Sequence, residues 1–143
     1  VEAQRSDTLR LPLLWSVVKG EHPTADSLGQ LSGIAMDAAG TVYVSDFAAN
    51  TIWVFDARGR SQRAIGRQGR GPGEFVAPTG IAISPDRKLY VRDQNEVSRF
   101  GADAASGRLS RFETRFSGGA FNDWVSTLAT RFDAQGRVYY PNF

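Results

Sequence analysis

The glycine-rich stretch GRQGRGPGEF at residues 66–75 is the first candidate for chemistry, because closely spaced glycines can cradle a phosphate group. A Walker loop requires Gly-x4-Gly-Lys followed by Ser or Thr, and residues 66–74 contain neither lysine nor a hydroxyl side chain. A dinucleotide fingerprint requires Gly-x-Gly-x-x-Gly leading from a strand into a helix. Glu74 occupies the third glycine position and Pro78 follows. Both nucleotide motifs are therefore excluded, and the stretch is interpreted as a connection between two strand units.

Residues that could perform catalysis are scarce in this chain. The single histidine, His22, lies in the polar segment KGEHPTADS, and there is no cysteine. A catalytic base or a metal ligand needs partner groups, and the lack of cysteine excludes disulfides, thiolate chemistry and cysteine-ligated zinc. The turns DAAG, DARG and DAQG lack the several carboxylates of a calcium loop. We therefore expect no catalytic residue, no metal and no cofactor.

Two aspartates, Asp46 and Asp93, end equivalent segments of the chain, and Asn142 ends a third. They could form a cation site or an acid–base pair. Alternatively, each side chain could accept backbone N–H bonds in the turn that follows. A structural role recurs in every repeat, whereas a catalytic role need not. The repetition therefore favours Asp46, Asp93 and Asn142 as structural turn caps.

These residues belong to an internal repeat. The segment GIAMDAAGTVYVSD at 33–46 aligns without a gap on GIAISPDRKLYVRD at 80–93, and a third copy, TRFDAQGRVYYPN at 130–142, places Tyr139 on Tyr90. Apolar residues alternate with period two between turn residues, which is typical of β-strands. We predict strands at 9–18, 31–36, 41–46, 51–56, 61–66, 79–84, 88–93, 96–100, 109–116, 126–132 and 137–141.

Four short strands in about 47 residues, repeated along a chain, are the signature of a β-propeller blade. The 143 residues, 41% of them hydrophobic, are long enough for one globular domain. We therefore predict an all-β fold of about two and a half blades, each with four antiparallel strands. The expected divisions are a leading strand and loop (1–28), blade one (29–66), blade two (67–116) and a partial blade three (117–143).

The segments GPGEFVAPTGIAI and LYVRDQNEVSRF resemble the NHL-repeat family of six-bladed propellers, and LSGIAMDAAGTVYVSD in the preceding unit resembles it too. Arg92 departs from the small residue usual in that family, and the third copy carries STLAT and Pro141 in place of its motifs. The resemblance implies a propeller fold. Its members include protein and RNA binders and a few lyases and hydrolases that act in or near the axial opening.

The propeller arrangement would bring the blade-to-blade connection and the turn between the second and third strands to one face. We expect a rim there that suits acidic or extended polymeric partners, because arginine binds carboxylates through paired hydrogen bonds. Its predicted members are Phe47, Asn50, Arg67, Gln68, Arg70, Glu74, Arg92, Asp93, Gln94 and Asn95. An ordinary solvated surface is the alternative interpretation.

Two and a half blades cannot close a ring, because propellers close with about 4–8 blades. We therefore expect the chain to associate with itself, for instance as a dimer, or with a missing half in a longer polypeptide, and to act as a binding scaffold. The alternative is a propeller hydrolase or lyase whose catalytic groups lie partly elsewhere.

Charge and hydropathy narrow the expected partners. The net charge of +2 makes nucleic acid an unlikely partner, and no apolar run reaches the about 20 residues that span a bilayer. The first residue is not methionine, so we expect that an upstream segment was removed, either a cleaved signal peptide or a part trimmed from the chain. Together with what the resemblance implies for bacterial relatives, this favours a secreted or periplasmic bacterial protein over a cytoplasmic one.

Overall fold

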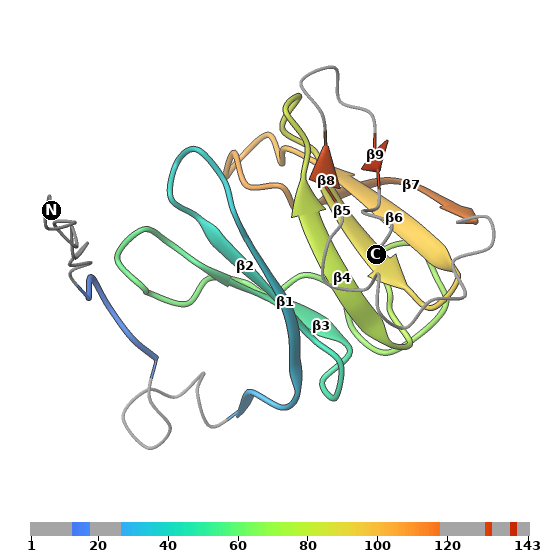
Figure 1. Cartoon of the computed structure of the whole chain (residues 1–143), viewed down its shortest axis with the longest axis horizontal. Helices are drawn as coiled ribbons and strands as arrows, with labels where there is room; N and C mark the ends of the chain where they lie inside the picture. Colours follow the sequence, from blue (N-terminus) through green and yellow to red (C-terminus); the bar gives the residue numbers. More distant parts are fainter. Residues whose placement is uncertain (1–12, 18–26, 118–130, 133–137, 140–143) are drawn as a thin grey trace, which may run out of the picture.

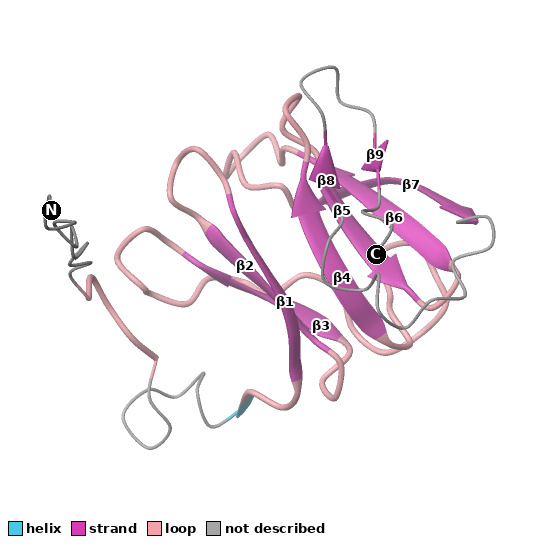
Figure 2. Ribbon diagram, in the orientation of Figure 1, coloured by secondary structure: helices cyan, strands magenta, loops and turns pink. Residues whose placement is uncertain are grey.

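The computed structural model describes residues 13–17, 27–117, 131–132 and 138–139, and nearly all of its regular structure is antiparallel β-sheet (Figures 1 and 2). Blade one contains β1 (Leu31–Met36), β2 (Val42–Asp46) and β3 (Thr51–Phe55). Blade two contains β4 (Pro78–Ile83), β5 (Leu89–Asp93), β6 (Glu96–Gly101) and β7 (Arg111–Ser117). A further pair consists of β8 (Arg131–Phe132) and β9 (Val138–Tyr139). The all-β prediction is confirmed.

The sequence repeat corresponds to a repeat of strand register. Ile34 pairs with Val44 in blade one, and its equivalent Ile81 pairs with Val91 in blade two. Both first strands carry a β-bulge just before the repeated glycine, at Ser32 and Thr79. In the third copy Arg131 pairs with Tyr139, as Ala82 pairs with Tyr90 in blade two.

Blades one and two pack closely where their first strands meet. A Cβ atom added to Gly33 would lie 3.0 Å from the Ile81 side chain, so the isoleucine rests on bare backbone. The bulged Ser32 donates its hydroxyl to the Pro78 carbonyl oxygen at 2.7 Å, which links the two sheets directly. The main core lies between the sheets and contains Tyr43, Ile52, Val54, Ile65, Phe75, Leu89, Val91, Phe100 and Leu109.

Tyr43 ties the far ends of the two blades together. Its ring is fully buried, its hydroxyl donates to Asp37 at 3.2 Å, and it accepts the Leu109 N–H at 3.0 Å. Burial raises the pKa of Tyr43 to about 12, and the nearby Asp37 carboxylate acts in the same direction, while the Leu109 hydrogen bond opposes them. The phenol is therefore neutral at physiological pH and can act as donor and acceptor at once.

Two predicted strands take a different form. The segment 61–66 makes only isolated bridges to β3, Ile52 with Ile65 and Phe55 with Ser61. The register differs by one residue between these bridges, so no continuous ladder forms and the sheet has three regular strands. The described part of the predicted strand 9–18, residues 13–17, pairs with no strand, and its Trp15 ring packs against Phe55 with 6.0 Å between centroids.

The predicted third blade is described only at its β8–β9 hairpin, and Asn142 and His22 lie outside the described residues. The described part of the chain contains no helix of the length and apolar character that a membrane span would need.

Replacing Tyr43 with phenylalanine tests the tie between the blades. Y43F would leave the buried Leu109 N–H without its acceptor, so we expect the free energy of unfolding to fall by about 1–3 kcal/mol. Urea denaturation followed by tryptophan fluorescence measures the change. Leu14→Ala is the control, because this side chain is 83% exposed and should shift stability by less than about 0.5 kcal/mol. Equal stability of Y43F and the unsubstituted chain would contradict the assigned role.

Candidate functional site

Three segments that lie far apart in the sequence meet at one end of the two sheets, and we call this surface the rim: the connection 66–77 and the turns 47–50 and 94–95. The N–H groups of Val76 and Ala77 donate to Asp93 at 2.9 and 2.6 Å, which places the turn 94–95 beside the end of the connection. Thr51 donates its hydroxyl to the Ile65 carbonyl oxygen at 2.9 Å, which places the turn 47–50 beside its beginning.

The glycine-rich connection is held by its own side chains. Phe75 is fully buried in the core, and a Cβ atom on Gly66 would collide with its ring. Glu74 accepts the Gly71 N–H at 2.9 Å and pairs with the Arg67 Nε at 2.9 Å. The Gly71 hydrogen bond, followed by that from Arg67, lowers the pKa of Glu74. The glycines of the connection thus allow a tightly turned backbone that packs against Phe75 and Glu74, which agrees with their interpretation as a connection between strand units.

Arg115 of β7 is a rim residue that the sequence analysis missed. Its guanidinium donates to the Arg70 carbonyl oxygen at 3.1 Å and to those of Gly71 and Glu74, and its Nε donates to the Ser98 hydroxyl at 3.1 Å. Its side chain is only 15% exposed. Arg115 therefore fixes the backbone of the connection and, through it, the position from which Arg70 projects.

A hollow of about 300 Å³ opens at the rim above blade two. Four predicted rim residues line it together with residues from the connection and the outer strands: Arg70, Val76, Asp93, Gln94, Asn95, Glu96, Arg115 and Ser117. Among the described residues, no acidic side chain lies within ion-pair distance of Arg70. Arg70, Gln94 and Asn95 are all exposed. The hollow therefore offers one guanidinium and two amides to a carboxylate-bearing or amide-rich ligand.

The other predicted rim residues lie outside this hollow. Arg67 and Glu74 pair with each other, and the Arg92 Nε donates to the Gln94 carbonyl oxygen at 3.3 Å. Phe47 is 42% exposed in the turn of blade one. Asn50 has a positive φ of 52°, and its buried Oδ1 has no hydrogen-bond partner within the part of the chain that the structure describes.

Asp46 is buried and accepts hydrogen bonds from three parts of blade one. Gly29 and Gln30 donate at 2.7 and 3.0 Å, Ala48 and Ala49 at 3.1 and 3.0 Å, and the Trp53 indole at 2.9 Å. Burial raises the pKa of Asp46, but the hydrogen bonds together outweigh it and lower the pKa below its usual value.

Asp93 holds the equivalent segment of blade two, through Val76 and Ala77. In both blades the carboxylate thus binds the segment that leads into the first strand, about 16 residues earlier in the chain. Within the described ranges no three His, Cys, Asp or Glu side chains are grouped to hold a metal ion.

The lowered pKa of Asp46 predicts a pH dependence of stability. The ionised carboxylate stabilises the fold above its unfolded-state pKa of about 3.9, and this stabilisation is lost as pH falls through the lower folded-state value. D46N should therefore be less stable at pH 7 and lose less stability than the unsubstituted chain between pH 5 and pH 2. Urea titrations across this range measure both slopes, with Asp86→Asn at an exposed turn as control. Parallel slopes for D46N and the unsubstituted chain would refute the assignment.

No curated protein matches the sequence. A crystal structure of selenomethionine-substituted virginiamycin B lyase from Staphylococcus aureus is similar, with a TM-score of 0.53 and 14% sequence identity. The alignment covers 78% of this chain and 34% of the lyase chain, so this chain spans about a third of that structure's length. At this identity the similarity concerns the fold alone.

The family described as "6-bladed beta-propeller" matches residues 24–108. This range contains all of blade one, the connection and the first three strands of blade two. The propeller prediction is thereby confirmed. Because the match covers more than half of the 143 residues, the chain belongs to the family of six-bladed β-propellers.

Proposed function

We propose that this chain is a non-enzymatic interaction scaffold of NHL-like propeller type that completes its ring with a second copy of itself. The NHL-like assignment is supported by the GPGEFVAPTGIAI and LYVRDQNEVSRF segments. The scaffold proposal is supported above all by an apolar sheet face that the described blades leave open. The family has six blades and this chain carries two and a partial third, so two copies would bring together four blades and two partial ones.

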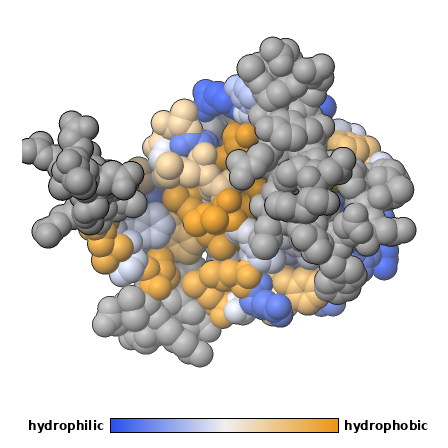
Figure 3. Space-filling view, in the orientation of Figure 1, coloured by the Kyte–Doolittle hydropathy of each residue, from blue (hydrophilic) through white to orange (hydrophobic). Residues whose placement is uncertain are grey.

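The open face lies on the side of blade one opposite blade two. Ile34 and Met36 of β1 are 71% and 66% exposed. In the alignment of the two repeats they correspond to Ile81 and Ile83, which in blade two pack against the core between the blades. Figure 3 shows apolar surface around the position of β1. The same type of surface is thus covered by a neighbouring blade in one repeat and uncovered in the other.

The leading segment covers only part of this face. Trp15 and Val17 pack against the cluster of Val42, Val44 and Phe55. This contact lies over β2 and β3, whereas Ile34 and Met36 lie on β1 and stay exposed. In blade two, the equivalent residues Ile81 and Ile83 pack against the neighbouring blade. The surface that stays uncovered on blade one is therefore the equivalent of the surface through which blade two makes its closest contact.

The repeat also specifies what must cover the face. Ile81 rests on Gly33, and Ala35 and Tyr43 stand beside that glycine on the same side of blade one. A blade that covers Ile34 must therefore present a small residue at the glycine position and a tyrosine on its second strand. In the third copy these positions hold Ala129, Arg131 and Tyr139. The third blade of a second copy thus has the required tyrosine, and Ala129 is a small residue at the glycine position. The poorest match is Arg131, which stands at the position of Ala35.

The oligomeric state tests this proposal. We expect the purified chain to elute as a dimer, at twice the 15.6 kDa chain mass, in size-exclusion chromatography with light scattering. I34D should weaken dimerisation at least tenfold, because a carboxylate would be buried without a partner. Ala38→Asp, in the exposed turn after β1, is the matched control and should dimerise normally. A monomer at all accessible concentrations would refute self-association.

A second variant identifies the covering blade. The A129G/R131A double substitution restores the Gly-x-Ala pattern and should strengthen dimerisation if the third blade is the partner surface. If I34D weakens the dimer while A129G/R131A leaves it unchanged, a different surface of the second copy covers the face.

We further propose that the rim binds acidic, extended partners through Arg70. Its guanidinium is exposed beside two exposed amides, and Arg115 fixes the backbone that carries it. Poly-L-glutamate is a suitable probe, and R70A should lower its affinity about three- to tenfold in fluorescence anisotropy. Arg58→Ala, an exposed arginine in the turn after β3, is the control. Equal losses in both variants would show that only overall charge matters.

A further inference from the structure

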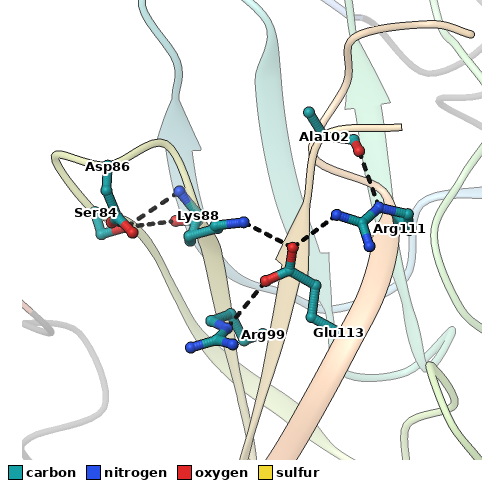
Figure 4. Close-up of polar contacts among 7 residues, drawn as sticks. All are labelled: Ser84, Asp86, Lys88, Arg99, Ala102, Arg111 and Glu113. Carbon is teal, nitrogen blue, oxygen red and sulfur yellow. Dashed lines mark hydrogen bonds and ion pairs between the residues drawn. The ribbon is translucent and has the colours of Figure 1, made fainter. Parts of the chain in front are cut away.

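A carboxylate surrounded by three cations lies on blade two, away from the rim. Glu113 of β7 accepts from Lys88 Nζ at 2.7 Å and from the Arg111 guanidinium at 2.9 Å through Oε1, and from Arg99 Nε at 3.1 Å through Oε2. Figure 4 shows Arg99 of β6, Arg111 of β7 and Lys88, which directly precedes β5, converging on the carboxylate. We call Lys88, Arg99, Arg111 and Glu113 the basic cluster.

Two backbone features make room for the basic cluster. β6 and β7 change register between Arg99 and Phe100, which leaves Glu113 as the extra residue of a β-bulge. A bulge re-aims the side chain of the extra residue, and here the carboxylate reaches across β6 toward Lys88. Gly101 supplies the space, because a Cβ atom there would collide with the Glu113 carboxylate and lie 3.0 Å from Lys88 Nζ. A side chain at position 101 would therefore be incompatible with this arrangement.

The basic cluster carries an excess of positive charge. Glu113 balances one of its three cations, and its side chain is 12% exposed, whereas those of Lys88, Arg99 and Arg111 are 28%, 39% and 57% exposed. The Lys88 hydrogen bond is the largest of several causes that lower the pKa of Glu113, so this carboxylate is ionised at neutral pH. Asp86, which Figure 4 also draws, accepts from the Ser84 hydroxyl and, among the described residues, forms no ion pair with the cations of the cluster.

Several donors of the basic cluster remain available. Arg111 uses its Nε for the Ala102 carbonyl oxygen and one terminal nitrogen for Glu113. Arg99 uses only its Nε, so both of its terminal nitrogens lack a hydrogen-bond partner within the described ranges. Glu113 thus acts as a positioning residue that holds three cations close together, with unfilled donors at the surface.

We propose that the basic cluster binds a doubly charged oxyanion, such as inorganic phosphate or sulfate, or a phosphoryl or sulfate group of a larger ligand. The excess of two positive charges matches a dianion, and the terminal nitrogens of Arg99 suit bidentate contact with two oxygens. The site is separate from the rim and from the open face of blade one, so it stands independently of the proposed scaffold function.

Titration with sodium sulfate tests the site directly. The chain should bind sulfate saturably in calorimetry at constant ionic strength set with sodium chloride, and amide NMR signals near Gly101 and Glu113 should shift. R99Q and K88Q should each weaken binding about tenfold. R58Q, which removes an equal charge in blade one, should leave sulfate affinity unchanged. No saturable binding, or equal weakening by R58Q, would overturn the proposal.

Titrations with other anions identify the kind of ligand, and an additional variant tests the site if a first variant misfolds. Phosphate and phenyl phosphate separate a free ion from a phosphoryl group on a ligand, and tenfold tighter binding of phenyl phosphate favours the latter. Acetate, which carries one charge, should bind at least tenfold more weakly than sulfate. If K88Q unfolds, R99K provides the second variant, since it keeps the charge but loses the bidentate fork. Unchanged sulfate affinity in a folded R99K would refute the bidentate geometry.

Discussion

The contact of Ile81 with the bare backbone of Gly33 is the constraint on which the rest of this structure depends. A propeller blade cannot cover both of its faces alone, so each sheet must find a neighbour. Near the axis the first strands approach so closely that a Cβ at Gly33 would lie 3.0 Å from Ile81. This close approach places Ser32 within reach of Pro78 and encloses the core between the blades.

The same constraint explains why the polar groups of the interface are arranged as they are. Once the sheets are in contact, Tyr43 and the Leu109 N–H are both buried and must satisfy each other. Asp46 and Asp93 have a comparable task at the opposite end, where each binds the segment that leads into a first strand. The recurring aspartate thereby sets where each first strand begins, and hence where its glycine meets the neighbouring blade.

Much of the strand arrangement could be predicted from the sequence, because equivalent residues of the two repeats pair in the same strand register. The alignment of residues 33–46 with 80–93 reproduces the observed pairing of β1 with β2 and of β4 with β5. The fourth strand of blade one could not be foreseen as two isolated bridges, since its apolar spacing is ordinary and only the one-residue register change interrupts it. The rim prediction brought Arg70, Asp93, Gln94 and Asn95 to one hollow, but it assigned no role to Arg115.

Arg115 and the basic cluster were missed for one physical reason, the bulge at Glu113. In an uninterrupted ladder Thr114 would stand opposite Ser98, whereas the extra residue places Arg115 there. A bulge has little sequence signature, because it changes which residues face each other without changing which residues are present. One inserted position thus turns Glu113 toward Lys88 and Arg99 and turns Arg115 toward the connection. The anchoring of the connection by Arg115 and the basic cluster are therefore two consequences of the same local irregularity in β7, which the alternation pattern of the strand alone would not have predicted.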